Sequence, residues 1–255
     1  MIHYKSASEL GKMRRSARIL ADTILRVMEA VAPGRTTADL DAVAEEHILA
    51  AGAVSNFKGY RGTYPATICT SLNDEIVHGI PSASRVLAEG DLLSLDFGCI
   101  WEGFHSDSAV SLFVGGVAPS QEAERLVEVT EAALGAAIAA VVPGARLTDI
   151  GAAIEGAAAP EGLGIVREYG GHGIGRAMHE DPFIQNYGPG GRGPALKPGL
   201  TLALEPMLNL GGEETRLLPD GWTVVTADGS ISAHFEHTVA VTEDGHEVLT
   251  ARDGR

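Results

Sequence analysis

The stretch GDLLSLDFGCIWEGFHSDSAV, residues 90–110, contains two apolar runs that each carry one aspartate. The runs are typical of β-strands, and the linker around Trp101 and Glu102 favours a hairpin turn between them. Such a hairpin would set Asp96 roughly opposite Asp107, with Cβ atoms about 4.5–5.5 Å apart. Two anions at that distance repel each other unless a cation lies between them. The stretch therefore predicts a cation site on a β-hairpin.

The same pattern returns in the second half of the chain. Three pairs of segments match in order: VAPG (31–34) with VVPG (141–144), GDLLSLD (90–96) with GLTLALE (199–205), and HSD (105–107) with HFE (234–236). Chance similarity in a chain rich in alanine and glycine is the alternative, but the matches keep their order and end on carboxylates. We therefore predict one domain over residues 1–255 with two similar halves, at about 13–115 and 120–242, around a shared cleft.

Each half is predicted to hold helices followed by strands, which is an α/β (α+β) architecture. Caps and breakers set the expected boundaries. Helices are expected from Ser6 or Ser8 to Pro33-Gly34, from a Thr37 cap through Leu49, and from Pro119-Ser120 to Val142, and strands at 66–70, 91–99 and 107–114.

Composition excludes several classes of protein. The chain has 255 residues and a net charge of -15, so it lacks the overall basic character of a nucleic-acid-binding protein, and we expect no DNA partner. Two cysteines, Cys69 and Cys99, cannot form a disulfide framework, which favours a reduced cytoplasm. The polar first 15 residues do not resemble a signal peptide, and the most apolar run, 132–142, is too short to span a bilayer.

Four carboxylates and one histidine form the candidate metal site. Each half supplies two acids at equivalent positions, Asp96 with Asp107 and Glu205 with Glu236, and His172 lies in a glycine-rich GGHGIG segment. Any one of these residues alone is more often solvated or structural. Together they suit two divalent ions such as Mn, Fe, Co or Zn. Two such ions can share a water and lower its pKa, which gives a hydroxide able to attack an amide.

Seven motifs in order cover the chain from about Met13 to Val241. They are VHGIP (77–81), LDFG (95–98), GFHSD (103–107), GHGIG (171–175), MHE (178–180), LEP (204–206) and AHFEHT (233–238). In this set the chain resembles the type I methionine aminopeptidases. That resemblance implies a pita-bread fold, with two pseudo-symmetric halves around a dinuclear metal cleft. It makes Asp107 and Glu236 the bridging ligands, with Asp96 completing one metal and His172 and Glu205 the other.

The resemblance also implies the roles of residues around the metals. His78 would position the scissile amide, His179 would hydrogen-bond the substrate carbonyl, and Glu205 would take a proton from the attacking water. An apolar pocket for methionine would be lined by Tyr60, Tyr64, Cys69, Met178 and Trp222. The chain departs from the usual pattern here, because GYRGTYP (59–65) is one residue longer and Met178 replaces a frequent aromatic residue.

The implied activity is removal of the N-terminal methionine from nascent proteins whose second residue is small. The partners would be nascent N-termini, with a possible transient ribosome contact through Lys12, Arg14, Arg15 and Arg18, and no membrane. A cytoplasmic monomer is expected. Two alternatives are an Xaa-Pro aminopeptidase or prolidase-like enzyme, which usually has an additional N-terminal domain, and a non-catalytic peptide-binding module, which usually has lost metal ligands.

Overall fold

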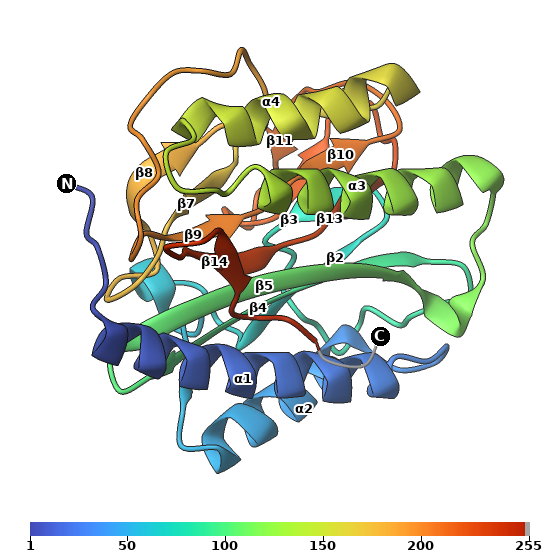
Figure 1. Cartoon of the computed structure of the whole chain (residues 1–255). Coiled ribbons are helices and arrows are strands. Elements are labelled where there is room, and N and C mark those ends of the chain that lie inside the picture. Colours follow the sequence, from blue (N-terminus) through green and yellow to red (C-terminus); the bar gives the residue numbers. More distant parts are fainter. Residues whose placement is uncertain (253–255) are drawn as a thin grey trace.

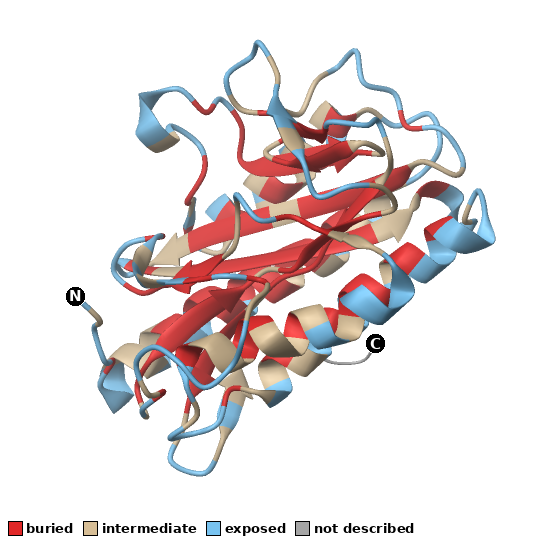
Figure 2. Ribbon diagram, turned by 90° about the horizontal axis from the view of Figure 1, so that it is seen from above, coloured by how far each residue is buried: buried red, intermediate tan, exposed pale blue. Residues whose placement is uncertain are grey.

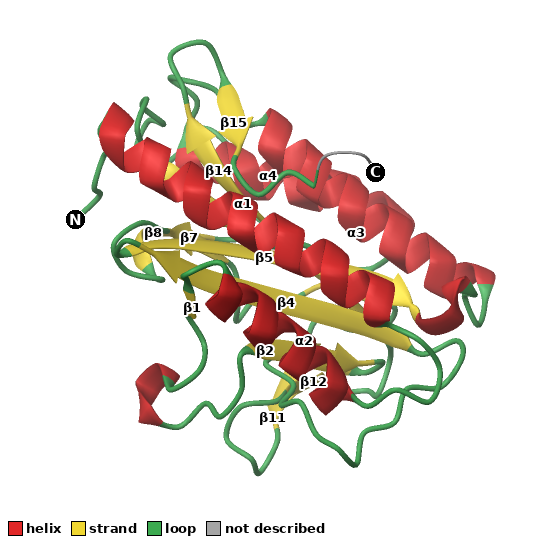
Figure 3. Ribbon diagram, turned by 90° about the horizontal axis from the view of Figure 1, so that it is seen from below, coloured by secondary structure: helices red, strands yellow, loops and turns green. Residues whose placement is uncertain are grey.

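The computed structural model describes residues 1–252 and shows strands flanked by two pairs of helices (Figure 1). The helices are α1 (Ala7–Ala30), α2 (Thr37–Ala50), α3 (Gln121–Ala139) and α4 (Leu147–Ala158). Helices α1 and α2 pack together on the first half, and α3 and α4 pack together on the second (Figure 3). Short 3-10 turns occupy Tyr60–Gly62, Val114–Gly116 and Ala159–Glu161. No helix of the described residues is long and apolar enough to cross a membrane.

The strands of residues 1–252 form four small sheets. Their bounds are β1 (Val54–Ser55), β2 (Ile68–Leu72), β3 (Glu75–Val77), β4 (Leu92–Trp101), β5 (Phe104–Phe113), β6 (Gly164–Ile165), β7 (Gly171–Gly173), β8 (Glu180–Ile184), β9 (Thr201–Leu204), β10 (Met207–Asn209), β11 (Thr215–Leu217), β12 (Val224–Thr226), β13 (Ser232–His234), β14 (His237–Val241) and β15 (His246–Val248). Strands β1, β2 and β5 pair with β4 in the first half, and β15, β14, β9, β7 and β8 make the largest sheet of the second.

The helix boundaries follow from local capping. Ser6 caps α1 in a capping box with Glu9, and Ser120 caps α3, as the sequence predicted. The expected Thr37 cap was wrong: Thr36 caps α2, because its side chain and that of Asp39 satisfy each other's backbone N–H groups. Helix α3 also ends earlier than expected, at Ala139, three residues short of Val142.

The hairpin of β4 and β5 turns one residue later than expected. Glu102 and Gly103 both have positive φ angles, 47° and 77°, as a two-residue hairpin turn requires, and glycine takes that conformation without a steric cost. The register therefore pairs Asp96 with Ala109 and Gly98 with Asp107. The two aspartates are diagonal neighbours on one face of the sheet, not directly opposite as predicted.

The two halves repeat the same local structure. Gly34 donates its N–H to the Leu87 carbonyl at 2.8 Å, and Gly144 donates to the Leu196 carbonyl at 2.9 Å. The strands differ, because the second half is interrupted between β9 and β10 at Pro206, which has no N–H to donate to a strand partner. The halves therefore have related backbones but unequal strands. The exact limits of the repeat stay a prediction.

A backbone pair joins the halves at the centre of the molecule. Glu236, between β13 and β14, donates its N–H to the Ala109 carbonyl at 3.0 Å, and Ala109 donates in return at 3.3 Å. Beside this seam the Ser108 hydroxyl donates to the Glu236 carbonyl at 2.7 Å. The seam therefore brings the carboxylates of both halves together.

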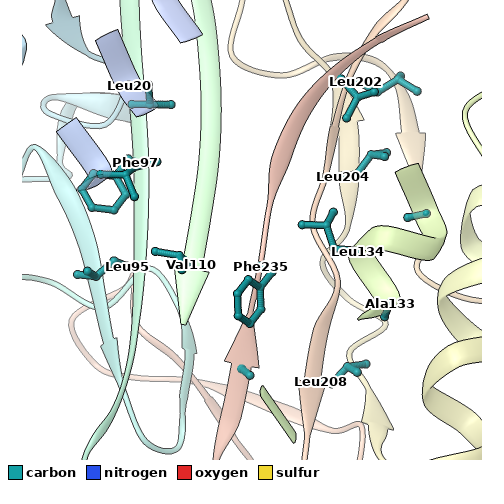
Figure 4. Close-up of a cluster of buried hydrophobic side chains, with 14 of the residues drawn as sticks. Leu20, Leu95, Phe97, Val110, Ala133, Leu134, Leu202, Leu204, Leu208 and Phe235 are labelled. Carbon is teal, nitrogen blue, oxygen red and sulfur yellow. The ribbon is translucent and has the colours of Figure 1, made fainter. Parts of the chain in front are cut away.

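One apolar core extends under both halves. Phe97, Leu95 and Val110 from the first half and Leu204 and Phe235 from the second belong to the same buried cluster (Figure 4). Strands β4, β5, β9 and β14 are buried almost throughout, whereas β8, β11, β15 and the outer faces of the helices are partly or fully exposed (Figure 2). The continuous core fixes the halves relative to each other, and so it fixes the distances between the ligands they carry.

Candidate metal centre and substrate cavity

A cavity of about 490 Å³ opens where the two halves meet. Every predicted site residue lines it: His78, His179, Glu205, Asp96, Asp107, His172, Glu236, Tyr60, Tyr64, Cys69, Met178 and Trp222. These residues come from both halves of the sequence and from separate strands and loops, so the site is assembled by the tertiary structure. The structure therefore gathers the predicted residues into one site.

Three of the candidate ligands form a compact group. One ligand atom each from Asp107, His172 and Glu236 lies within 4.8 Å of the others, and all three residues are buried. Glu205 approaches the same group, because its Oε1 atom lies 3.5 Å from Nε2 of His172. Asp96 joins from β4 as the diagonal neighbour of Asp107. The arrangement offers one nitrogen and several carboxylate oxygens to a common centre.

Burial makes the negative charges of this group costly. Oδ1 of Asp96, Oδ1 of Asp107 and Oε1 of Glu236 are buried and have no hydrogen-bond partner among the described residues. Burial raises the pKa of Asp96 to about 7. It raises that of Asp107 well above its usual range, with further contributions from Asp96 and Glu205. Burial and neighbouring carboxylates also raise the pKa values of Glu205 and Glu236 well above their usual range. Unpaired buried anions are strongly unfavourable, so this group fits divalent cations.

The local structure of β7 prepares His172 as a ligand. Its Nδ1 atom lies 2.9 Å from the Gly173 carbonyl, an arrangement in which Nδ1–H donates and Nε2 is left free. Burial lowers the pKa of the imidazole to about 3, so it is neutral at pH 7. Gly171 must be glycine, because a Cβ atom there would lie 2.4 Å from the Ala203 carbonyl oxygen. The backbone thus holds the ring in one place.

His179 and His78 lie beside this group. The ring centroids of His179 and His172 are 4.3 Å apart, and Nδ1 of His179 lies 2.9 Å from the Tyr60 hydroxyl. Burial, together with Arg61, lowers the pKa of His179, which favours its neutral form. His78 has a φ of 62°, an uncommon conformation for a residue other than glycine, and such conformations cluster at functional sites. Burial lowers its pKa to about 4.

The other wall of the cavity is apolar. Tyr64, Cys69 and Met178 pack with Phe57 and Ala66, and three partly buried residues adjoin them: Tyr60, Ile80 and Trp222. The Tyr64 hydroxyl donates to the carbonyls of Ile68 and Gly79, at 3.0 and 3.1 Å. The wall therefore has the chemistry to hold an apolar side chain.

Sequence reasoning missed several residues that line the cavity. They are Phe57, Arg61, Glu168, Tyr169, Gly170, Glu180, Asp181 and Phe183. Tyr169 contacts His78 edge-on, with ring centroids 5.8 Å apart. Glu180 stands in the MHE motif next to His179, and that adjacency was the one sequence signal that could have found it. Phe183 reaches the cavity because β8 pairs with β7 opposite His172.

Comparison with known proteins gives a consistent picture. The model of metallopeptidase family M24 matches residues 11–243. Methionine aminopeptidase 1 of Mycobacterium tuberculosis is 50% identical over 256 residues, covering 98% of this chain and 95% of the relative. That of Bacillus subtilis is 47% identical over 250 residues, with 98% and 99% covered. The crystal structure of methionine aminopeptidase from Thermotoga maritima superposes with a TM-score of 0.95 at 40% identity, covering 98% of this chain and 99% of the other.

Proposed function

The chain belongs to metallopeptidase family M24, and from that premise we propose that it is a metal-dependent aminopeptidase that removes N-terminal methionine. The observation that carries the proposal is a buried carboxylate–histidine group facing an apolar wall across one cavity. The group suits hydrolysis of an amide, and the wall suits the methionine side chain. Full-length relatives that carry the name methionine aminopeptidase, at 41–50% identity, support the same activity.

The proposed cofactor is a pair of divalent ions. Asp96, Asp107 and Glu236 with His172 and Glu205 would hold them, since four carboxylates balance the charge of two such ions. Bound divalent ions would supply Lewis acidity and acidify a water molecule. Asp107 and Glu236 would each contribute carboxylate oxygens to the ions, one from each half of the chain. Mn, Fe, Co and Zn all suit this donor set.

The chain's own residues would do the rest of the chemistry. Glu205 would take up a proton from the attacking water, since its carboxylate lies at the ligand group, with Oε1 3.5 Å from Nε2 of His172. If the Tyr60 hydroxyl donates to Nδ1 of His179, Nε2–H of that neutral ring is free to donate to the substrate carbonyl. His78, held between Tyr169 and Trp222, would contact the scissile amide and orient it.

We propose that the enzyme favours a small residue after the methionine. The metal group is buried, and the residue that follows the methionine would lie beside it in a confined cavity. The proposed substrates are nascent polypeptides in the cytoplasm, with the enzyme acting as a monomer. A transient ribosome contact through Lys12, Arg14, Arg15 and Arg18 on α1 is part of the proposal, and in the free protein Lys12, Arg14 and Arg18 form exposed ion pairs with Glu102, Glu247 and Asp22.

The first test is methionine release after chelation and readdition of Mn or Co. Release from Met-Ala-Ser, with none from an Ala-Pro control, is the expected result. Cleavage of Ala-Pro instead would indicate a prolidase-like enzyme, and cleavage of neither would indicate a peptide-binding module. Met-Gly and Met-Leu peptides test the second position, where equal rates would contradict the preference for small residues.

Two variants and a matched control test the residue assignments. His172→Ala and Glu205→Ala should each abolish turnover while the protein remains folded, because each removes a proposed ligand. His246→Ala serves as the control, since His246 is exposed and lies outside the cavity. Wild-type rates in either site variant, with metal in excess, would contradict the proposed centre.

A further inference from the structure

The N-terminal segment passes the loop that carries His179. This segment precedes α1 and lies beside the loop between β7 and β8 (Figure 1). Lys5 donates its backbone N–H to the Gly199 carbonyl at 2.7 Å, and its side chain continues toward the β7–β8 loop. A residue near the start of the chain is therefore fixed next to the cavity.

Lys5 forms a buried ion pair with Glu180. Its Nζ atom lies 2.7 Å from Oε2 of Glu180, and the two side chains are only 5% and 9% exposed. A surface pair between α1 and the β4–β5 turn provides a contrast, since the side chains of Lys12 and Glu102 are 40% and 51% exposed. Exposed pairs contribute little, whereas a buried charge that loses its partner is strongly unfavourable. The Lys5–Glu180 pair therefore constrains the segments that carry it.

The other oxygen of Glu180 closes the β7–β8 loop. Oε1 accepts the backbone N–H groups of Arg176 at 2.8 Å and Ala177 at 3.2 Å. These bonds enclose Met178 and His179, which line the cavity. One carboxylate thus ties the loop to itself through one oxygen and to Lys5 through the other.

Two glycines leave room for the Lys5 chain. A Cβ atom on Gly175 would lie 2.3 Å from Cε of Lys5, and one on Gly199 would lie 2.7 Å from the Lys5 carbonyl oxygen. Real Cβ atoms essentially never approach other atoms so closely. A side chain at either glycine would displace Lys5. The absence of side chains at Gly175 and Gly199 therefore allows Lys5 to reach Glu180.

We propose that Lys5 is a positioning residue for His179, acting through Glu180. The inference rests on the proposed function, in which His179 donates a hydrogen bond to the substrate carbonyl. Lys5 holds the Glu180 carboxylate, the carboxylate holds the loop, and the loop sets the position of the His179 ring relative to His172. The contribution of a hydrogen-bond donor to catalysis depends on its position to within fractions of an ångström.

The test measures Lys5→Met in the wild type and in a His179→Ala background. Methionine keeps the length of the side chain and removes the ammonium group. With metal saturating and Met-Ala-Ser as substrate, Lys5→Met should lower kcat about tenfold in the wild type and change KM less than about twofold. In the His179→Ala background it should lower kcat less than about twofold further, because the group it positions is absent. Lys12→Met is the matched control and should leave kcat unchanged.

The outcomes separate the inference from the proposed function. An equal loss of kcat in both backgrounds would mean that Lys5 supports the protein generally, and it would overturn the inference. No loss in the wild-type background would overturn it as well. A His179→Ala variant with unchanged kcat would remove the proposed role of His179 and the inference with it.

A second variant guards against a folding defect. If Lys5→Met does not give a folded protein by circular dichroism, Glu180→Gln is measured in the same two backgrounds. Glutamine keeps an oxygen for the Arg176 and Ala177 N–H groups but removes the charge that Lys5 holds. It should show the same dependence on His179, and an equal loss in both backgrounds would again overturn the inference.

Discussion

Replacement of Asp96 by asparagine should stabilise the metal-free protein while it removes activity. Oδ1 of Asp96 is buried without a hydrogen-bond partner, and burial raises the pKa of this carboxyl from 3.8 to about 7. The folded protein therefore resists ionisation of Asp96 far more than the unfolded chain does. Asparagine has nearly the same shape and carries no charge, so it removes this unfavourable term together with a proposed metal ligand.

The size of the effect follows from the two pKa values. Each pH unit between them corresponds to about 1.4 kcal/mol, so ionisation of Asp96 costs the folded state about 4 kcal/mol relative to the unfolded chain. The folded-state pKa is the higher one, so the cost is absent below pH 3.8, grows as the pH rises and is complete above pH 7. We expect the variant to be more stable by about 4 kcal/mol at pH 8, about 2 kcal/mol at pH 5, and near zero at pH 3.8.

Urea unfolding in the presence of a chelator measures this difference. The wild type and Asp96→Asn would be compared at pH 5 and pH 8, with intrinsic fluorescence of the two tryptophans as the signal. Added Mn should reverse the order of stability, because only the wild type keeps the full ligand set. If Asp96→Asn were less stable than the wild type at pH 8 in the presence of the chelator, the reasoning would be refuted.

Three further perturbations test the cavity and its supports. Tyr60→Phe should lower kcat several-fold with little change in KM, because the hydroxyl that fixes the His179 tautomer is lost; steady-state kinetics decide, and an unchanged kcat would contradict that role. The pKa of His78 is about 4 in the folded protein and 6.5 in the unfolded chain, so unfolding takes up a proton between these pH values and the wild type loses stability as the pH falls from 6.5 to 4. His78→Gln should make this loss of unfolding free energy smaller by about 3 kcal/mol. Denaturant unfolding of both proteins at pH 6.5 and pH 4 measures the difference. Gly171→Ala should lower the free energy of unfolding by about 1–3 kcal/mol and weaken Mn binding, because its Cβ atom would press on the Ala203 carbonyl oxygen. Calorimetric titration with Mn measures the binding, and an unchanged affinity would contradict this expectation.

The family, the fold class and the apolar and polar walls of the cavity could be predicted from the sequence, because short motifs fix them. The helix cap was predictable from the sequence, because Asp39 lies three residues after Thr36 and completes a capping box with it, a signal that the choice of Thr37 overlooked. The register of Asp96 and Asp107 was missed for a similar reason. A turn one residue earlier looks equally good until the positive φ of Gly103 is taken into account.

Contacts between distant segments were beyond sequence reasoning. Lys5 reads as one more polar residue before a helix, and nothing near it in the chain indicates Glu180 as its partner. Phe183 and Tyr169 likewise reach the cavity only through strand pairing and loop packing. Motifs identify the residues that carry the chemistry, whereas the residues that hold them in place depend on the three-dimensional path of the whole chain.

The seam between Ala109 and Glu236 has a consequence for how the protein is made. The neighbouring contact from the Ser108 hydroxyl to the Glu236 carbonyl spans 128 residues. Such a contact cannot form until most of the chain has been synthesised, and closing so long a loop is slow. A growing chain that ends before β13 holds Asp96, Asp107, His172 and Glu205 but lacks Glu236 and the seam that it forms with Ala109. The enzyme should therefore acquire its activity in a single late step of folding, when the second half docks on the first.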